Sequence, residues 1–410
     1  MAESDQKEDS FPSWMNNSFF EMALRSGENN SNITVTSTDV QRATAPGENF
    51  MSEIYRVTVQ MVRGDESEKK SLIVKITPIG KYTTQFVNES DMFAREARML
   101  KDVMPAMQRL LDEVLPRKCK PFAAKHVYSC LDPPTPVIIV EDLKEQGFQM
   151  SHLSANLDLN HSLLVIRTIA RFHAASVVLK EKEPELLEPF MDGKVLDKLY
   201  NQIGDVVASA IMSLANQAEK WPEFEDRFIH KIRNIGRNFP ENIVKLRKRA
   251  EKEFNVLAHN DLWVTNIMFR YSDTAHNILD LRFVDFQLCY WMSPAIDLLY
   301  FLHSSTATEL LDKHDVLIED YYTTLGETLA LLGYKDLHPK REDFMQQIES
   351  RGAFATIIAV TIRSVLLLDR SKLQDFEKRL KEEHRENLCS DIYKQHLRKV
   401  LPILEKKGWI

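Results

Sequence analysis

The sequence is poor in glycine and cysteine and has no excess of positive charge. Glycine supplies 12 of 410 residues, whereas roughly 7% is usual, which excludes a glycine-rich architecture and favours long helices. The formal net charge is −7, so the strong basic excess needed for general binding to a nucleic-acid backbone is missing. The four cysteines include no CxxC pair. We therefore expect reduced thiols, with neither a disulfide framework nor a zinc cluster.

Long hydrophobic runs and a secretory leader are also missing. Residues 1–10 are polar and acidic, which is unlike a signal peptide. The longest apolar stretch, 354–368, is interrupted by Arg363 and is too short to span a bilayer, so we expect a buried helix there. These features predict a cytoplasmic protein without a membrane span.

Hydrophobic periodicity predicts an α+β chain that changes character near Leu143. The first part is expected to contain a helix over 11–24, strands over 33–36, 54–62 and 71–76, a helix over 91–111 bent at Pro105, and strands over 123–130 and 137–140. The second part is expected to be mostly helical, with candidate helices over 163–179, 195–218 and 228–254 and a β-rich island over 256–288. We therefore divide the chain into an N-terminal extension over 1–30, a β-rich lobe over 31–143 and a helical lobe over 144–410.

The β-rich island holds the most specific pattern. His259, Asp261 and Asn266 form His-x-Asp-x4-Asn, and Asp285 follows in an Asp-Phe-Gln string. Taken singly, these are ordinary polar residues of strand ends and turns. Together they fit kinase chemistry, in which one Asp accepts a hydroxyl proton while an Asn and a second Asp hold Mg²⁺. Oxygen ligands suit Mg²⁺, and no thiolate set for zinc accompanies them.

A lysine and an acid in the β-rich part complement this pattern. Lys75 follows the apolar run 72–74, which argues for a buried strand whose ammonium needs a partner. Glu96 is the favoured partner because its helix places it near Phe93 and Leu100, although other acids are close in sequence. Such an ion pair can aim a lysine at nucleotide phosphates.

Two further segments are candidates for nucleotide contacts. The loop 47–52 contains a single glycine, and its backbone amides with the side chains of Asn49 and Ser52 are suited to capping phosphates. The strand 137–140 runs into Glu141 and Leu143, where an adenine would find backbone donors and acceptors. This segment is also where we expect the chain to pass from one lobe to the other.

These residues resemble the ecdysteroid kinase-like family, also called CHK kinase-like, a branch of the protein-kinase-like superfamily beside choline kinases and aminoglycoside phosphotransferases. The resemblance covers roughly residues 30–400. Its motifs are Gly47-Glu48-Asn49-Phe50-Met51-Ser52, Val74-Lys75, Phe93-x-x-Glu96, Glu141-Asp142-Leu143, Ala170-Arg171-Phe172-His173-Ala174, His259-Asn260-Asp261-Leu262-Trp263-x-x-Asn266 and Asp285-Phe286-Gln287. Protein kinases carry Arg-Asp where this chain has Asn260-Asp261 and Gly where it has Gln287, so a small-molecule kinase is indicated.

The resemblance implies a two-lobed protein-kinase-like fold that uses ATP and Mg²⁺ and phosphorylates an alcohol. Carried over by position, Asp261 would be the catalytic base, Asn266 and Asp285 the Mg²⁺ ligands, and Lys75 the phosphate-orienting cation paired with Glu96. The remaining residues with implied roles are Gly47, Asn49, Phe50, Ser52, Glu141 and Leu143 for nucleotide binding, and His259 and Asp297 for support of the catalytic loop. His173 is expected to be a structural histidine.

The acceptor is less well defined by the sequence. The family implies an ecdysteroid or a xenobiotic alcohol, in which case the enzyme would act in detoxification. Trp263, Tyr290 and Trp291 would suit the wall of a steroid pocket, a cation–π cage for a choline- or ethanolamine-like amine, or simply the core. Two competing hypotheses are a pseudokinase that only binds nucleotide and a metal-dependent hydrolase that uses His259, Asp261 and Asp285. The oligomeric state is left open.

Overall fold

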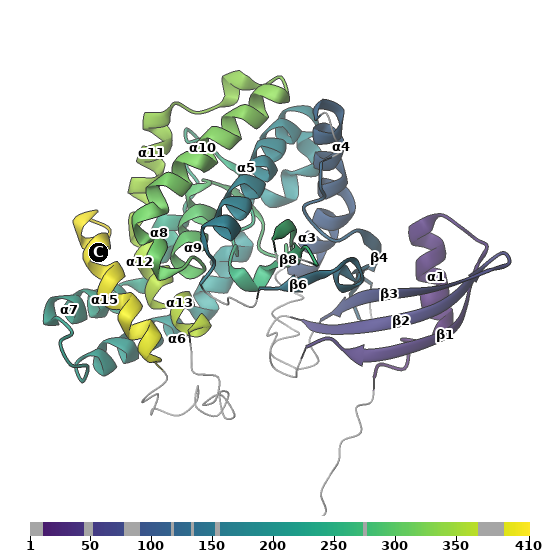
Figure 1. Ribbon diagram of the computed structural model, residues 1–410, viewed down its shortest axis with the longest axis horizontal. Helices are drawn as coiled ribbons and strands as arrows, with labels where there is room; N and C mark the ends of the chain where they lie inside the picture. Colours follow the sequence, from purple (N-terminus) through teal and green to yellow (C-terminus); the bar gives the residue numbers. More distant parts are fainter. Residues whose placement is uncertain are drawn as a thin grey trace, which may run out of the picture. The chain divides into compact units, whose positions relative to one another are not determined.

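The computed structural model of the chain describes residues 11–44, 52–77, 91–115, 119–132, 135–151, 156–273, 277–367 and 389–410 (Figure 1). The chain forms two compact units. The first comprises Met1–Lys101 and Ala123–Phe148, and the second comprises Asp102–Phe122 and Gln149–Ile410. The first is rich in strands and the second is mostly helical, which confirms the mixed α+β fold that the sequence predicts.

The first unit is built on a five-stranded antiparallel sheet with the order β1-β2-β3-β5-β4. Its elements are α1 (Asn17–Glu28), β1 (Ile33–Arg42), β2 (Glu53–Arg63), β3 (Glu66–Ile76), α3 (Met92–Arg98), β4 (His126–Cys130) and β5 (Val137–Glu141). Alternate residues of β2 are buried, from Tyr55 to Met61, because successive side chains of a strand point to opposite faces. The apolar face joins one hydrophobic core with α1.

Helix α1 starts at a polar cap and packs onto that core. The side chain of Asn16 accepts a hydrogen bond from the backbone N–H of Phe19 at 3.1 Å, which satisfies one of the free donors at a helix start. Phe20 and Leu24 are fully buried against strand residues such as Ile33. The N-terminal helix is therefore an integral part of the first unit.

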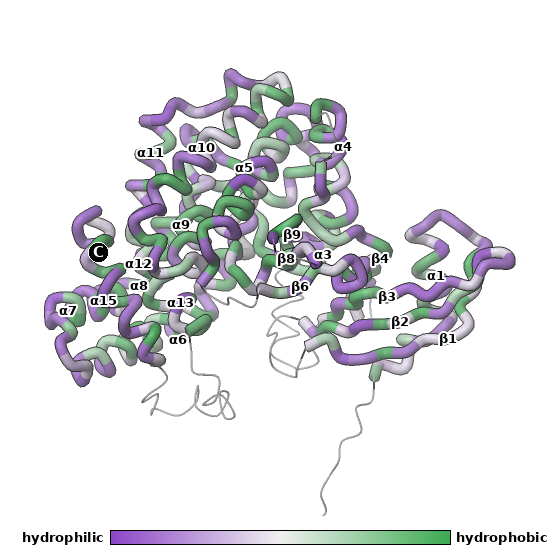
Figure 2. Tube along the Cα trace, in the orientation of Figure 1, coloured by the Kyte–Doolittle hydropathy of each residue, from purple (hydrophilic) through white to green (hydrophobic). Residues whose placement is uncertain are grey.

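The second unit consists mainly of helices with a small amount of sheet. Its helices are α4 (Met104–Val114), α5 (Leu159–Lys182), α6 (Lys194–Ala218), α7 (Asp226–Arg237), α8 (Phe239–Arg247), α9 (Ala295–Ser304), α10 (His314–Leu331), α11 (Arg341–Ser350), α12 (Gly352–Val360), α13 (Ile362–Leu366) and α15 (Asp391–Lys406). Its strands are β6 (Phe148–Met150), which begins at the last residue of the first unit, β7 (Val256–Ala258), β8 (Ile267–Tyr271), β9 (Ile278–Phe283) and β10 (Tyr290–Met292). Figure 2 shows mostly hydrophilic residues along α7 and α11.

Helix α5 contributes much of the core of the second unit. It packs against α10 and α4, and most of its residues from His161 to Leu179 are buried. Among the described helices it is the one that has the length and apolar character to cross a membrane, and 72% of its most apolar window is buried inside the structure. Most of its apolar side chains are thus buried by packing against the rest of the unit.

Three of the predicted helices are interrupted in the structure. The helix predicted over 228–254 is interrupted at Asn238, the residue before α8, and ends at Arg247; Pro240 in the first turn of α8 has no N–H to continue α7. Up to Leu366, the stretch that begins at 354 forms most of α12 and all of α13, separated at Thr361. The predicted bend near Pro105 is a π-helical turn, Met99–Val103, followed by α4.

The division into units also differs from the predicted lobes. Segment Asp102–Phe122 belongs to the second unit rather than the first, because α4 packs along α5. The extension predicted over 1–30 is not separate, since α1 lies on the sheet. The chain passes between the units after Lys101, Phe122 and Phe148, whereas a single passage near Leu143 was predicted.

Candidate active site

The catalytic-loop pattern follows strand β7 in the second unit. Strand β7 pairs with β10, with Ala258 opposite Tyr290, and is fully buried because its three residues are apolar. The chain then leaves the strand through His259, Asn260 and Asp261 and forms a short 3-10 helix, Val264–Asn266, before β8 begins. The strand end therefore fixes where the polar residues of the pattern lie.

A β-hairpin brings Asn266 and Asp285 to the same place. In the β8–β9 pair Ile267 lies opposite Phe283, so Asn266 and Val284 face each other at its open end. The backbone N–H of Val284 donates to the carbonyl oxygen of Asn266 at 3.0 Å. Asp285 is the next residue, so the two predicted magnesium ligands are neighbours in space although they are distant in sequence.

Asp261 is held by two neutral donors. Tyr300 Oη of α9 donates to Asp261 Oδ1 at 2.8 Å, and Asn266 Nδ2 donates to Asp261 Oδ2 at 2.8 Å. Burial and the charge of Asp285 raise the pKa of Asp261 to about 6, against the opposing effect of these two hydrogen bonds. Each carboxylate oxygen keeps a second lone pair, so the group can still accept a proton.

A buried carboxylate from α9 supports the backbone of this loop. Asp297 is fully buried, and its two oxygens accept the backbone N–H groups of His259 and Asn260, each at 2.7 Å. His173 Nε2 of α5 lies 3.0 Å from Asp297 Oδ2, and Tyr321 Oη lies 2.7 Å from His173 Nδ1. Burial alone would raise the pKa of Asp297, but the hydrogen bond to His173 and further partners lower it. The structure therefore places Asp297 and His173 in the supporting positions expected from the sequence.

Asn260 adopts a backbone conformation that few residues tolerate. Its φ is 69°, and Asp285 likewise has φ 67°, in the left-handed region that Asn and Asp enter more readily than other non-glycine residues. The side chain of Asn260 accepts a hydrogen bond from Arg247 and donates to the carbonyl oxygen of Leu288 at 3.0 Å. These contacts stabilise a sharp turn directly before Asp261.

His259 is a structural residue of the loop. It is fully buried, and its Nε2 lies 3.2 Å from the carbonyl oxygen of Val284, which ties the loop to the end of β9. Burial lowers its pKa, so the neutral imidazole is favoured. No hydrogen-bond partner of its Nδ1 is found in the described part of the chain.

The donor set around Asn266 fits a hard cation. Both side-chain hydrogen bonds of Asn266 use Nδ2, so within the described ranges its Oδ1 accepts none and remains available as a ligand. Asp285 adds a carboxylate that receives a hydrogen bond from Gln287 at 3.3 Å. No group of three or more His, Cys, Asp or Glu side chains able to hold a metal occurs in the described residues. One carboxylate and one amide oxygen suit Mg²⁺, which usually keeps waters and substrate phosphates as its other ligands.

The first unit contains the predicted lysine pair. Lys75 lies in β3 between Ile54 of β2 and Ile138 of β5, and its Nζ is 2.6 Å from Glu96 Oε2 of α3. Both residues are buried. The structure therefore pairs Lys75 with Glu96, the acid favoured from the sequence.

The remaining predicted nucleotide residues are only partly covered by the structure. Gly47, Asn49 and Phe50 lie outside the described residues. Ser52 is buried just before β2. Glu141 ends β5, where its Oε1 accepts the N–H of Lys125 at 2.9 Å, and Leu143 is buried at the start of a short 3-10 helix.

The three aromatic residues considered for the acceptor differ in their surroundings. Trp263 is half-buried in the catalytic loop, and Nε1 of its indole has no partner among the described residues. Tyr290 is buried and Trp291 is half-buried in β10. The indole N–H of Trp263 is therefore a buried donor without a partner in the described part of the chain.

Sequence reasoning did not identify two residues beside Asp261. Tyr300 lies on the apolar helix α9, where it reads as a core residue. Arg247 ends α8, is buried, and stacks over the rings of Tyr200 and Phe354 with distances of 5.0 and 5.5 Å to the ring centroids. Its helix was predicted to continue past it, so nothing in the sequence marked it as part of the site.

A comparison with models of protein families identifies the family of the chain. The model of the ecdysteroid kinase-like family matches residues 46–334, which is more than half of the sequence. The chain belongs to the ecdysteroid kinase-like family. The matched residues include the segments of both units that carry Lys75, Glu96, Asp261, Asn266 and Asp285.

Two further comparisons complete this result. No curated protein is significantly similar to the chain. Among solved structures, an ethanolamine kinase of Plasmodium vivax is similar over 90% of this chain and 83% of its own, with 12% sequence identity and a TM-score of 0.43. Membership of the ecdysteroid kinase-like family supports a small-molecule kinase.

Proposed function

We propose that the protein is an ATP- and Mg²⁺-dependent kinase that transfers the γ-phosphate to a hydroxyl group of a small lipophilic alcohol, of the ecdysteroid or xenobiotic class. The observation that carries the proposal is the environment of Asp261. A half-buried carboxylate with a pKa of about 6, held by Tyr300 and Asn266, is suited to a general base near neutral pH.

In the proposed reaction the hydroxyl oxygen of the acceptor attacks the γ-phosphorus. The bond from the γ-phosphorus to the β,γ-bridging oxygen breaks and ADP leaves, while the hydroxyl proton passes to Asp261. Tyr300 and Asn266 hold the Asp261 carboxylate in position, and Asp297 holds the backbone of the loop. Positioning is the main contribution that a protein makes to phosphoryl transfer.

Asn266 Oδ1 and the Asp285 carboxylate would hold Mg²⁺, which neutralises phosphate charge when bound. Lys75, buried and paired with Glu96, would orient the α- and β-phosphates. Because the net charge of the chain is −7, nucleotide attraction must come from such local cations rather than from the overall field.

The acceptor class rests on apolar and aromatic residues rather than on charge. Trp263 follows Asp261 by two residues and is half-buried, so the accessible part of its ring could form part of an apolar wall for the acceptor. A steroid alcohol offers an apolar body that suits such a wall. We expect the enzyme to prefer hydroxylated steroids or drug-like alcohols over choline-like amines.

The proposal is tested by measuring ADP release over a panel of hydroxylated steroids, plant and drug alcohols, choline and ethanolamine, with the phosphorylated product identified by mass. Asp261→Asn should lower turnover by roughly two to four orders of magnitude. Asp273→Asn changes an exposed aspartate of the same unit and serves as the control, with turnover unchanged.

The outcomes of this panel separate the candidate functions. Nucleotide binding without turnover on any acceptor would favour a pseudokinase. Phosphorylation of choline or ethanolamine alone would support the kinase activity but would contradict the proposed acceptor class. Full turnover in Asp261→Asn would remove Asp261 from its proposed role.

A further inference from the structure

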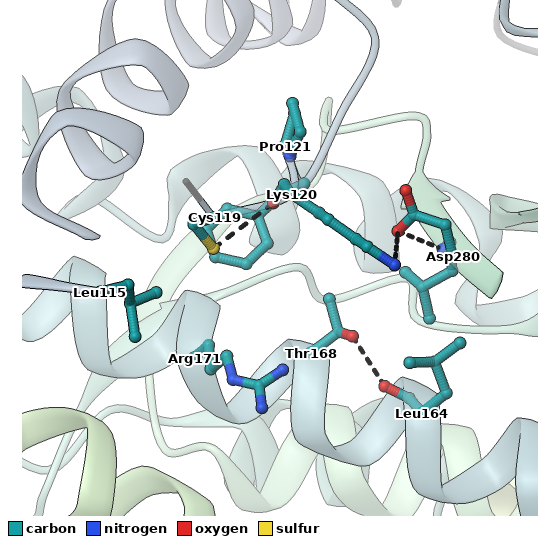
Figure 3. A pocket seen from close by; sticks show the side chains of 10 residues that line it. Leu115, Cys119, Lys120, Pro121, Leu164, Thr168, Arg171 and Asp280 are labelled. Atoms are coloured by element: carbon teal, nitrogen blue, oxygen red, sulfur yellow. Dashed lines mark hydrogen bonds and ion pairs between the residues drawn. The ribbon is translucent and has the colours of Figure 1, made fainter. Parts of the chain in front are cut away.

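The second unit contains a cavity that shares no residue with the catalytic loop. It has a volume of about 440 Å³ and lies beside α5, the end of α4 and β9 (Figure 3). This volume is within the range of small-molecule sites, roughly 300–1,000 Å³. Its lining residues are Leu115, Cys119, Lys120, Pro121, Phe122, Leu164, Thr168, Arg171, Asp280 and Leu281.

Most of the cavity wall is apolar, but one cation of α5 belongs to it. Arg171 is half-buried, and no hydrogen bond or ion pair of its side chain is found within the described ranges. Phe122, Leu164 and Leu281 line the same cavity as Arg171. An arginine in this setting offers a planar fork of N–H donors that matches one carboxylate.

The acid in the wall does not cancel this positive charge. Asp280 lies 2.9 Å from Arg282, 3.6 Å from Arg270 and 3.9 Å from Lys120. Figure 3 shows Lys120 extending towards Asp280, separate from Arg171. Three cations thus already neutralise this one carboxylate of the wall, so Asp280 does not cancel the charge of Arg171.

Cys119 provides a natural reporter in the same wall. Burial raises the pKa of its thiol, so the neutral thiol is the dominant form at neutral pH and adds no negative charge. The thiol is half-buried and interacts electrostatically with Arg171. A ligand bound at Arg171 would therefore lie near this sulfur atom.

We propose that this cavity is a binding site for a small organic carboxylate with an apolar body, with the carboxylate on Arg171 and the apolar part against Phe122, Leu164 and Leu281. One guanidinium provides one bidentate contact, which favours a monoanion. The site is independent of the proposed kinase activity, because none of its residues takes part in the catalytic loop.

The direct test compares probes of one shape and different charge on the full chain. Hexanoate, hexanamide and hexylamine are titrated by calorimetry, and we expect hexanoate to bind about tenfold to a hundredfold more tightly than hexanamide, as charge-assisted hydrogen bonds would give. Arg171→Gln should remove this preference. Lys182→Gln removes one exposed charge at the far end of α5 and should leave it intact.

The location is tested on the unaltered chain by alkylation of its cysteines, measured by mass spectrometry. Hexanoate should slow alkylation of Cys119 several-fold and leave that of Cys130, which lies in the first unit, unchanged. Equal binding of hexanoate and hexanamide, an unchanged affinity in folded Arg171→Gln, or an unaltered Cys119 rate would each overturn the proposal. The alkylation measurement needs no variant, so it tests whether hexanoate binds in this cavity even where Arg171→Gln fails to fold.

Discussion

Tyr300 Oη of helix α9, which begins at Ala295, donates a hydrogen bond of 2.8 Å to Oδ1 of Asp261. The phenol is buried, and its pKa is raised well above its usual value by burial and by the Asp261 charge. It therefore remains protonated and donates to the ionised carboxylate. This contact links the packing of α9 to the proton affinity of the proposed base.

Tyr300→Phe should shift the acid limb of the pH–rate profile upwards. A hydrogen bond to the carboxylate favours its ionised form, so removing it raises the pKa of Asp261 above about 6. Activity as kcat/KM should then fall at a higher pH than in the unaltered protein. Tyr322→Phe, which removes a half-buried hydroxyl bonded to the carbonyl oxygen of Pro339, is the matched control. If the acid limb of the pH–rate profile lies at the same pH in Tyr300→Phe as in the unaltered protein, Asp261 does not control the rate.

Breaking the buried pair of the first unit should be far more costly than breaking an exposed one. Glu96→Gln leaves the Lys75 ammonium buried beside a neutral partner, and we expect a loss of about 3 kcal/mol in the free energy of unfolding of that unit. Glu241→Gln breaks the exposed contact with Lys245 and should cost less than about 0.5 kcal/mol. Urea unfolding measures both.

The Lys75→Met, Glu96→Leu double variant distinguishes pairing from packing. Replacing both charges with apolar side chains should recover much of the stability lost in Glu96→Gln, because no unpaired charge remains. If the loss in the free energy of unfolding of the double variant equals the sum of the losses in the two single variants, the two side chains do not stabilise each other. ATP binding, in contrast, should not recover if Lys75 orients the phosphates.

Asp297→Asn should destabilise the catalytic loop. Both oxygens of Asp297 accept backbone N–H groups, whereas the amide of Asn presents a donor to one of them. A buried N–H left without an acceptor costs about 1–3 kcal/mol, which a lower urea midpoint of the second unit would reveal. Asp315→Asn, at an exposed aspartate paired with Lys407, is the control. Equal midpoints for the two variants would contradict the supporting role of Asp297.

Acidification should weaken the contact of α15 with the rest of the second unit. His303 and His314 are buried with ring centroids 4.9 Å apart, and His396 of α15 lies in the same region with its Nδ1 2.8 Å from Thr308 Oγ1. Burial is the main cause that lowers the pKa of each, to about 3 for His314 and about 2 for His396. Arg363 acts in the same direction on all three, Lys407 does so on His303 and His314, and Asp315 opposes them at His314.

The folded state therefore holds these histidines neutral, while the unfolded chain protonates them near pH 6.5. Stability is fully present above that pH and is lost as the pH falls below it, by about 1.4 kcal/mol per histidine at pH 5.5. The urea midpoint at pH 7.5 and 5.5 measures this loss. His314→Gln should reduce the difference between the two midpoints, and His230→Gln, at an exposed histidine, should not.

The sequence predicted the parts of the fold and the site that depend on local pattern. Alternation identified β2, an apolar run identified β3, and the spacing of Asp261 and Asn266 identified a loop that the structure places beside Asp285. Lys75 and Glu96 were paired because each needed a buried partner. These inferences need only neighbours in sequence or a well-known spacing.

The rest depends on contacts between distant segments. Tyr300 and Arg247 lie in helices whose pattern indicates only a core, so their roles beside the loop follow from how α8 and α9 pack. The break at Asn238 was missed because the apolar periodicity continues across it. Segment Asp102–Phe122 was assigned to the first unit because α4 follows α3 in sequence, whereas packing along α5 decides its place.

The β8–β9 hairpin has a consequence for how such sites can vary among related proteins. The ladder fixes Asn266 opposite Val284 at one end, and residues inserted between Tyr271 and Ile278, at the other end, would not alter that pairing. The number of residues between Asn266 and Asp285 is therefore free to change during evolution. The short spacing from Asp261 to Asn266 is not, because a direct hydrogen bond joins these two side chains. A relative with a longer hairpin would keep the same two oxygen ligands side by side.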